Sequence, residues 1–315
     1  MHQLISTTFL NLTLLFFAAT TAHTPHNNTA EASVVYIGAL ETKPIGWPEH
    51  AYGDGDTAMQ RIVRPLFYNM DGVWHSLQDV IGDTSIYPGG QLWHIAFDGK
   101  RIGELHSKKE SPRFPDAPWT WPRDTYHSTI EKNLPVIGQP TEAFSGWTGG
   151  AAPRPLVVVS ENNCLDPQRW KPFEPDTAEL PNLLRFYNSY LALMDDVDPV
   201  AYTDLQFAKS YKSVNNDQLL QVRLKTTEDN WSSYPIWIYQ SHNGYYVNLS
   251  YNIDLPFIDD FTDDDYSTNV LVDAGDYDNN GQSELLFWSS RYNGDGYILF
   301  SNDCAQMSGF LWGYH

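Results

Sequence analysis

Short apolar runs separated by tight-turn residues extend over most of the chain. In residues 219–225, Leu220, Val222 and Leu224 alternate with polar side chains, which predicts a half-buried strand. Four pairs of apolar runs are joined by residues that favour short turns, and each pair predicts a β-hairpin. The four turns are Asp71-Gly72, Asp98-Gly99, His242-Asn243-Gly244 and Asn293-Gly294-Asp295-Gly296. The pattern therefore predicts a mainly β chain with a multi-hairpin architecture.

One segment has helical periodicity instead. Apolar residues recur at helical spacing from Leu180 to Met194, and Pro181 suits the first turn of a helix. We expect one amphipathic helix within residues 177–196, with its apolar stripe packed on the core rather than on a cofactor.

The helix and the loops before it divide the predicted β structure into two units. Residues 34–176 form the N-terminal β unit and include loops rich in Pro and Trp, from Ser111 to Pro155. Residues 197–315 form the C-terminal β unit. No low-complexity tract separates the two units.

The first 22 residues are typical of a secretory signal peptide. The apolar run from Phe9 to Ala19 is followed by small residues that end at Ala22. This run is about half the length of the ~20 residues that a membrane-spanning helix requires. We therefore expect residues 1–22 to be a signal peptide, residues 23–33 to be a flexible leader, and the chain to have no transmembrane segment. The alternative is a buried N-terminal helix. Export would place the protein outside the cell, in the periplasm or in the cell envelope.

Charge and composition narrow the function classes. The 39 Asp and Glu residues against 19 Lys and Arg give a formal net charge of −20 on 315 residues. This balance argues against nucleic-acid binding and against electrostatic docking on anionic membranes. Ten of the acids fall in residues 254–284, which contain no Lys or Arg. The excess of negative charge is thus concentrated in one segment and is compatible with cation binding.

Cysteine content leaves two alternatives open. Cys164 and Cys304 are the only cysteines. An oxidising compartment would permit one disulfide between them, and the alternative is two unpaired buried thiols.

Residues 276–284, with the sequence DYDNNGQSE, form the most specific chemical pattern in the chain. Side-chain oxygens at positions 1, 3, 5 and 9, a backbone carbonyl at position 7 and a glycine at position 6 are a donor set suited to Ca²⁺. The predicted ligands are Asp276, Asp278, Asn280, Gln282 (through its carbonyl) and Glu284. An EF-hand does not fit, because position 12 is Phe287 and both flanks are strand-like. We expect a structural ion here; the alternative is a metal-free turn.

The segment from Val270 to Phe287 resembles the calcium-binding hairpin loop of FG-GAP repeats, also called VCBS or integrin-alpha-like repeats. The resemblance is carried by Asp276, Asp278, Asn280, Gly281 and Glu284, and it is confined to the C-terminal part of the chain. It implies a β-propeller-like architecture, while the hairpin pattern also suits a related multi-hairpin β architecture.

These observations favour a non-enzymatic, exported protein that acts in binding or in envelope or extracellular architecture. Its partner would be a carbohydrate or another extracellular protein. We predict no catalytic residues, because the chain has no zinc-binding His spacing, no nucleophile elbow and no phosphate-binding loop. The alternative is a secreted carbohydrate-active enzyme or lectin. Its candidate stacking residues are Trp119, Trp121, Trp147, Trp231 and Trp237.

Overall fold

The computed structural model describes ten segments of the chain. They are residues 34–44, 59–80, 85–108, 125–147, 150–161, 164–192, 202–226, 235–249, 268–291 and 293–314. The predicted signal peptide and leader, the acidic residues of 254–265, and Trp119, Trp121 and Trp231 lie outside these segments. No helix within the ten segments is long and apolar enough to cross a membrane.

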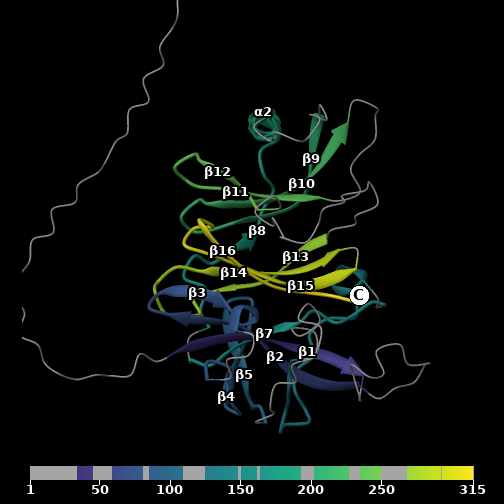
Figure 1. Ribbon diagram of the computed structural model, residues 1–315. Helices are drawn as coiled ribbons and strands as arrows, with labels where there is room; N and C mark the ends of the chain where they lie inside the picture. Colours follow the sequence, from purple (N-terminus) through teal and green to yellow (C-terminus); the bar gives the residue numbers. More distant parts are fainter. Residues whose placement is uncertain are drawn as a thin grey trace, which may run out of the picture. The chain divides into compact units, whose positions relative to one another are not determined.

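The described residues form three antiparallel sheets and one α-helix, labelled in Figure 1. The seven-stranded sheet has the order β3-β2-β1-β7-β4-β5, and β6 pairs with β2. Its strands are β1 (Val35–Pro44), β2 (Met59–Met70), β3 (Val73–Ser76), β4 (Leu92–Phe97), β5 (Lys100–His106), β6 (His127–Ser128) and β7 (Leu156–Val159). Two short 3₁₀ helices accompany it, η1 (Leu77–Val80) and η2 (Glu142–Phe144).

The other two sheets come from the second half of the chain. The five-stranded sheet has the order β12-β11-β10-β9-β8, and the four-stranded sheet has the order β13-β14-β15-β16. The strands of the five-stranded sheet are β8 (Lys171–Pro172), β9 (Tyr202–Lys212), β10 (Gln218–Thr226), β11 (Ile236–Gln240) and β12 (Tyr246–Asn248). Those of the four-stranded sheet are β13 (Thr268–Gly275), β14 (Glu284–Arg291), β15 (Gly294–Ser301) and β16 (Gln306–Gly313). The helices before β9 are η3 (Thr177–Glu179) and α2 (Leu180–Leu191).

All four predicted hairpins are present. The β2–β3 turn has φ of 56° at Asp71 and 81° at Gly72, and the β4–β5 turn has φ of 48° at Asp98 and 67° at Gly99. Two consecutive positive φ angles match the right-handed twist of the flanking strands, and Asp-Gly pairs adopt them readily. The β11–β12 and β14–β15 hairpins also form.

One hairpin has a shorter turn than predicted. β15 begins at Gly294, so Asp295 and Gly296 lie in the strand and not in the turn. A Cβ atom at position 296 would overlap the carbonyl oxygen of Phe310 on β16. Gly296 is therefore needed for the close approach of two strands, which the sequence pattern could not distinguish from a turn.

The four-stranded sheet, yellow in Figure 1, is buried on both faces. On β14, Leu286 and Trp288 pack in a core shared with the seven-stranded sheet. Leu285 and Phe287 pack in a second core, shared with the five-stranded sheet. Successive side chains of a strand point to opposite faces, so a continuous apolar run suits this position. Strands of the predicted N-terminal and C-terminal β units thus share one core.

The helix α2 covers one face of the five-stranded sheet. Leu183 and Tyr187 of α2 pack against Leu220 and Val222 of β10. The opposite face of β10 is covered at its start, because Leu219 belongs to the core shared with the four-stranded sheet. The predicted half-buried alternation is found from Val222 to Leu224, where Arg223 is exposed, but not at Leu219 and Gln221, which are buried. The amphipathic helix is confirmed.

The predicted mainly β, multi-hairpin architecture with one amphipathic helix is confirmed. Strands β13–β16 pair in chain order, as in one blade of a propeller, whereas the other two sheets hold seven and five strands. Cys164 and Cys304 are buried free thiols that belong to different cores. Burial raises the pKa of the Cys164 thiol to about 11, so this thiol is unreactive at neutral pH. The structure thus has the two unpaired thiols and not the disulfide.

Candidate metal centre

The predicted calcium loop connects β13 to β14 within the four-stranded sheet. As expected, both flanks are strands. The loop backbone enters the left-handed region at Asn279, with φ of 62°, and at Gly281, with φ of 89°. Asn and Gly are the residues that adopt this conformation most readily, so the local sequence accounts for the sharp turn.

Three of the five predicted ligands converge. Asp276, Asp278 and Glu284 each offer one carboxylate oxygen, and these oxygens all lie within 4.8 Å of one another. Within the described segments this is the one such group of three or more metal-ligating Asp, Glu, His or Cys residues. Negative charges at this separation repel one another, and the repulsion grows where water is excluded.

Glu284 is the most deeply buried of the three, with 1% of its surface exposed. Burial, and then the charge of Asp278, raise the pKa of Glu284 to about 8. Burial also raises the pKa of Asp278. Glu284 Oε2 accepts a 2.8 Å hydrogen bond from the backbone N–H of Tyr277, whereas Glu284 Oε1 is buried with no hydrogen-bond partner among the described residues. A buried oxygen without a donor is costly and is a natural position for a cation.

Backbone amides of the loop donate hydrogen bonds to the carboxylate oxygens of Asp276. Asp276 accepts hydrogen bonds from the amides of Asn280 at 2.8 Å and Gly281 at 2.9 Å. The exposed Asn280 turns its own Oδ1 to the amide of Gln282, at 2.7 Å. The structure therefore brings together the three carboxylates, and the roles of Asn280 and Gln282 as ligands remain predictions.

A buried tyrosine anchors the loop in the core. Tyr277 is fully buried, and its hydroxyl donates to Asp273 Oδ2 at 3.2 Å. Burial raises the pKa of Asp273 to about 7, although the nearby Arg154 guanidinium opposes this shift. Arg154 also donates through Nε to the carbonyl of Val272 at 2.8 Å. These contacts fix the end of β13, from which the loop begins.

Two segments far away in the sequence hold the loop from outside, and neither was predicted. Asn69, at the end of β2, donates from Nδ2 to Asp278 Oδ2 at 2.8 Å across 209 positions. Asp166, in the segment between β7 and β8, accepts from the hydroxyl of Ser283 at 2.6 Å. The backbone of Leu165 accepts from the amide of Asp276 at 2.7 Å. Asn69 stands beside an Asp-Gly turn, so its local sequence signals only a hairpin.

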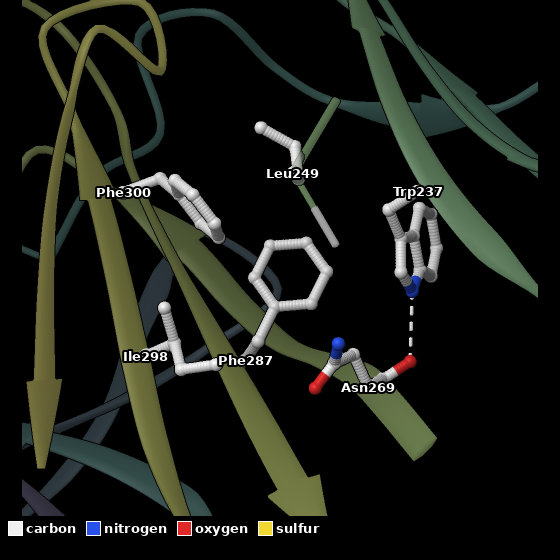
Figure 2. A pocket seen from close by; sticks show the side chains of 6 residues that line it. All are labelled: Trp237, Leu249, Asn269, Phe287, Ile298 and Phe300. Carbon is white, nitrogen blue, oxygen red and sulfur yellow. Dashed lines mark hydrogen bonds between the residues drawn. The ribbon is translucent and has the colours of Figure 1, made fainter. Parts of the chain in front are cut away.

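The tryptophans proposed for carbohydrate stacking do not share one site in the described residues. Trp237 is 1% exposed, and its indole N–H donates to the carbonyl of Asn269 at 2.7 Å. Figure 2 shows it among apolar side chains, and the centre of its ring lies 5.4 Å from that of Phe287 in an edge-on arrangement. Trp237 is therefore a core residue, and its assignment as a stacking platform is wrong. Trp147 is 37% exposed and lies 5.5 Å from the ring of Tyr314.

No protein-family model, curated protein or solved structure matches this chain.

Proposed function

We propose that this chain is an exported, non-enzymatic β-protein that carries a structural Ca²⁺ ion at the β13–β14 loop. It acts in binding or in envelope or extracellular architecture. The observation that carries the metal proposal is the convergence of Asp276, Asp278 and Glu284, one of whose oxygens is buried without a partner. The signal-like N-terminus supports export, and the resemblance of the loop to FG-GAP repeats supports calcium.

The chemistry of the donor set favours calcium over other ions. The three carboxylates supply only oxygen, which suits a hard cation and not zinc, since zinc prefers nitrogen and sulfur ligands. Asn280 and the carbonyl of Gln282 would complete an irregular oxygen shell, which calcium accepts more readily than magnesium. An ion on a loop between two paired strands offsets the repulsion among the carboxylates and couples folding to metal binding.

Calcium is expected to raise the thermal midpoint of the chelator-treated full-length protein. At a calcium concentration about 100 times the Kd, binding stabilises by about 2.7 kcal/mol, which corresponds to roughly 4 °C for a chain of this size. Circular dichroism during heating measures the shift. Magnesium at the same concentration is the control and should produce a much smaller shift. An unchanged midpoint with calcium would remove the metal proposal.

The carbohydrate-binding alternative is supported by Trp147, whose ring packs with that of Tyr314 beside the buried carboxylate of Asp295. Aromatic faces next to polar groups are typical of sugar subsites. A glycan array and a hydrolysis screen separate the alternatives. Binding that is lost on Trp147→Ala favours a lectin, turnover favours an enzyme, and silence in both assays favours the non-enzymatic structural protein.

A further inference from the structure

We infer that Asn69 is a positioning residue for the calcium site, and that the ion ties the β2–β3 hairpin of one sheet to the β13–β14 loop of another. The inference rests on the calcium site proposed above. It adds a residue from outside the loop, 209 positions away from Asp278. It also gives the ion a role beyond the loop itself, in the contact between two sheets.

The orientation of the Asn69 amide is fixed by two hydrogen bonds. Its Oδ1 accepts from the backbone N–H of Gly72 at 3.0 Å. Because the oxygen is used within the hairpin, the amide nitrogen must face the other way, where it donates to Asp278 Oδ2 at 2.8 Å. Asn69 is 6% exposed, so water does not compete strongly for either bond.

A neutral amide is well suited to this position. Asp278 Oδ1 accepts from the amide of Asn280 at 3.2 Å, so both oxygens of the Asp278 carboxylate are held. Asn69 fixes the carboxylate without neutralising the negative charge that attracts a cation. A Lys at position 69 would compete with the ion, and an Asp would add to the repulsion.

A second polar group of the same hairpin faces the site. Trp74 lies opposite Asn69 in the β2–β3 register. Its indole N–H, like Glu284 Oε1, is buried with no hydrogen-bond partner among the described residues. Opposite residues of an antiparallel pair direct their side chains to the same face, so Trp74 lies on the face of the hairpin from which Asn69 contacts Asp278.

The test is isothermal titration of CaCl₂ into the chelator-treated full chain, with the wild type, Asn69→Ala and Asn243→Ala. Asn243 is exposed in the β11–β12 turn and serves as the matched control. We expect the wild type and Asn243→Ala to bind calcium equally, and Asn69→Ala to bind about 10 to 100 times more weakly, as for other residues that orient a metal ligand.

A merely structural role for Asn69 would lower the unfolding midpoint in chelator and leave the calcium Kd unchanged. Equal Kd values for the wild type and Asn69→Ala would overturn the inference while leaving the calcium proposal intact. A wild type that binds no calcium would overturn both.

Hydrogen exchange of the wild type provides a second measurement if Asn69→Ala does not fold. On addition of CaCl₂, we expect exchange at the amides of Gly72 and Trp74 to slow at least about tenfold, because the hairpin end is tied to the occupied loop. The amides of Asn243 and Gly244, in the other hairpin turn, should not change. Equal exchange at the β2–β3 hairpin with and without calcium would contradict the inference.

Discussion

Glu284→Gln is expected to stabilise the calcium-free protein at alkaline pH and to abolish its response to calcium. Burial raises the pKa of Glu284 to about 8, so ionising this carboxyl in the folded protein is costly. The difference from its ordinary value corresponds to about 3–5 kcal/mol. Glutamine has nearly the same shape and no charge, so it avoids this cost and removes the negative charge that attracts the cation. Urea unfolding at pH 9, with chelator and then with calcium, measures both effects.

The sign of the pH dependence follows from the raised pKa. Between about pH 4.5 and pH 8 the folded protein keeps the Glu284 proton that the unfolded chain has lost, so the calcium-free wild type loses stability as pH rises through this range. Calcium must displace that proton, so its affinity should rise about tenfold per pH unit between pH 6 and 8. Glu104→Gln is the control, because Glu104 is a solvent-exposed glutamate of β5. The same calcium response in Glu284→Gln as in the wild type would contradict the proposed site.

Arg64→Met is expected to destabilise the protein by about 3–5 kcal/mol, because it removes the buried guanidinium that pairs with both oxygens of the Glu41 carboxylate and leaves only the more distant Lys43, at 3.6 Å. Arg64 is fully buried and contacts both oxygens of Glu41, from Nε at 3.0 Å and from Nη2 at 3.2 Å. Its guanidinium also lies 4.8 Å from the centre of the Trp312 ring. The double variant Arg64→Met with Glu41→Gln should recover much of the loss, since it removes both charges together. Urea unfolding at pH 7 measures these differences.

The same ion pair predicts a loss of stability in acid. Burial of Glu41 opposes its ionisation, but the charges of Arg64 and Lys43 and the hydrogen bonds from Arg64 and Tyr297 outweigh burial and lower the pKa to about 2. A lowered pKa stabilises the folded state above pH 4.5, and this contribution, about 3 kcal/mol, disappears as pH falls from 4.5 to 2. The double variant should lack this step. If Arg64→Met is as stable as the wild type at pH 7, the buried ion pair does not stabilise the protein as predicted.

Local sequence was sufficient for the hairpins, the helix and the three carboxylates. Asp71-Gly72 and Asp98-Gly99 encode tight turns within two residues, and the periodicity from Leu180 onward marks one face of α2. Asp276, Asp278 and Glu284 are close in sequence, so the turn that Gly281 permits is enough to predict that they lie near one another.

Contacts between distant segments could not be predicted. Asn69 and Asp166 reach the loop only after the sheets have packed, and neither stands in a pattern that indicates a ligand-holding role. Gly296 looks like a turn residue in the sequence. Glycine is found both in tight turns and where two strands approach closely, and the sequence does not distinguish the two uses. The Arg64–Glu41 pair likewise depends on the pairing of β1 with β2. The pattern of apolar residues in one sequence does not reveal which residues of two strands lie opposite each other.

The contacts that hold β13 also bear on self-association. β13 is one of the two edge strands of the four-stranded sheet, and the edge of a sheet is a template on which another chain can pair. Two of its carbonyls are occupied by side chains from elsewhere in the fold: Asn269 accepts from the indole of Trp237, and Val272 accepts from Arg154. A fifth strand would have to displace both donors, so the protein protects this edge against intermolecular strand addition and aggregation.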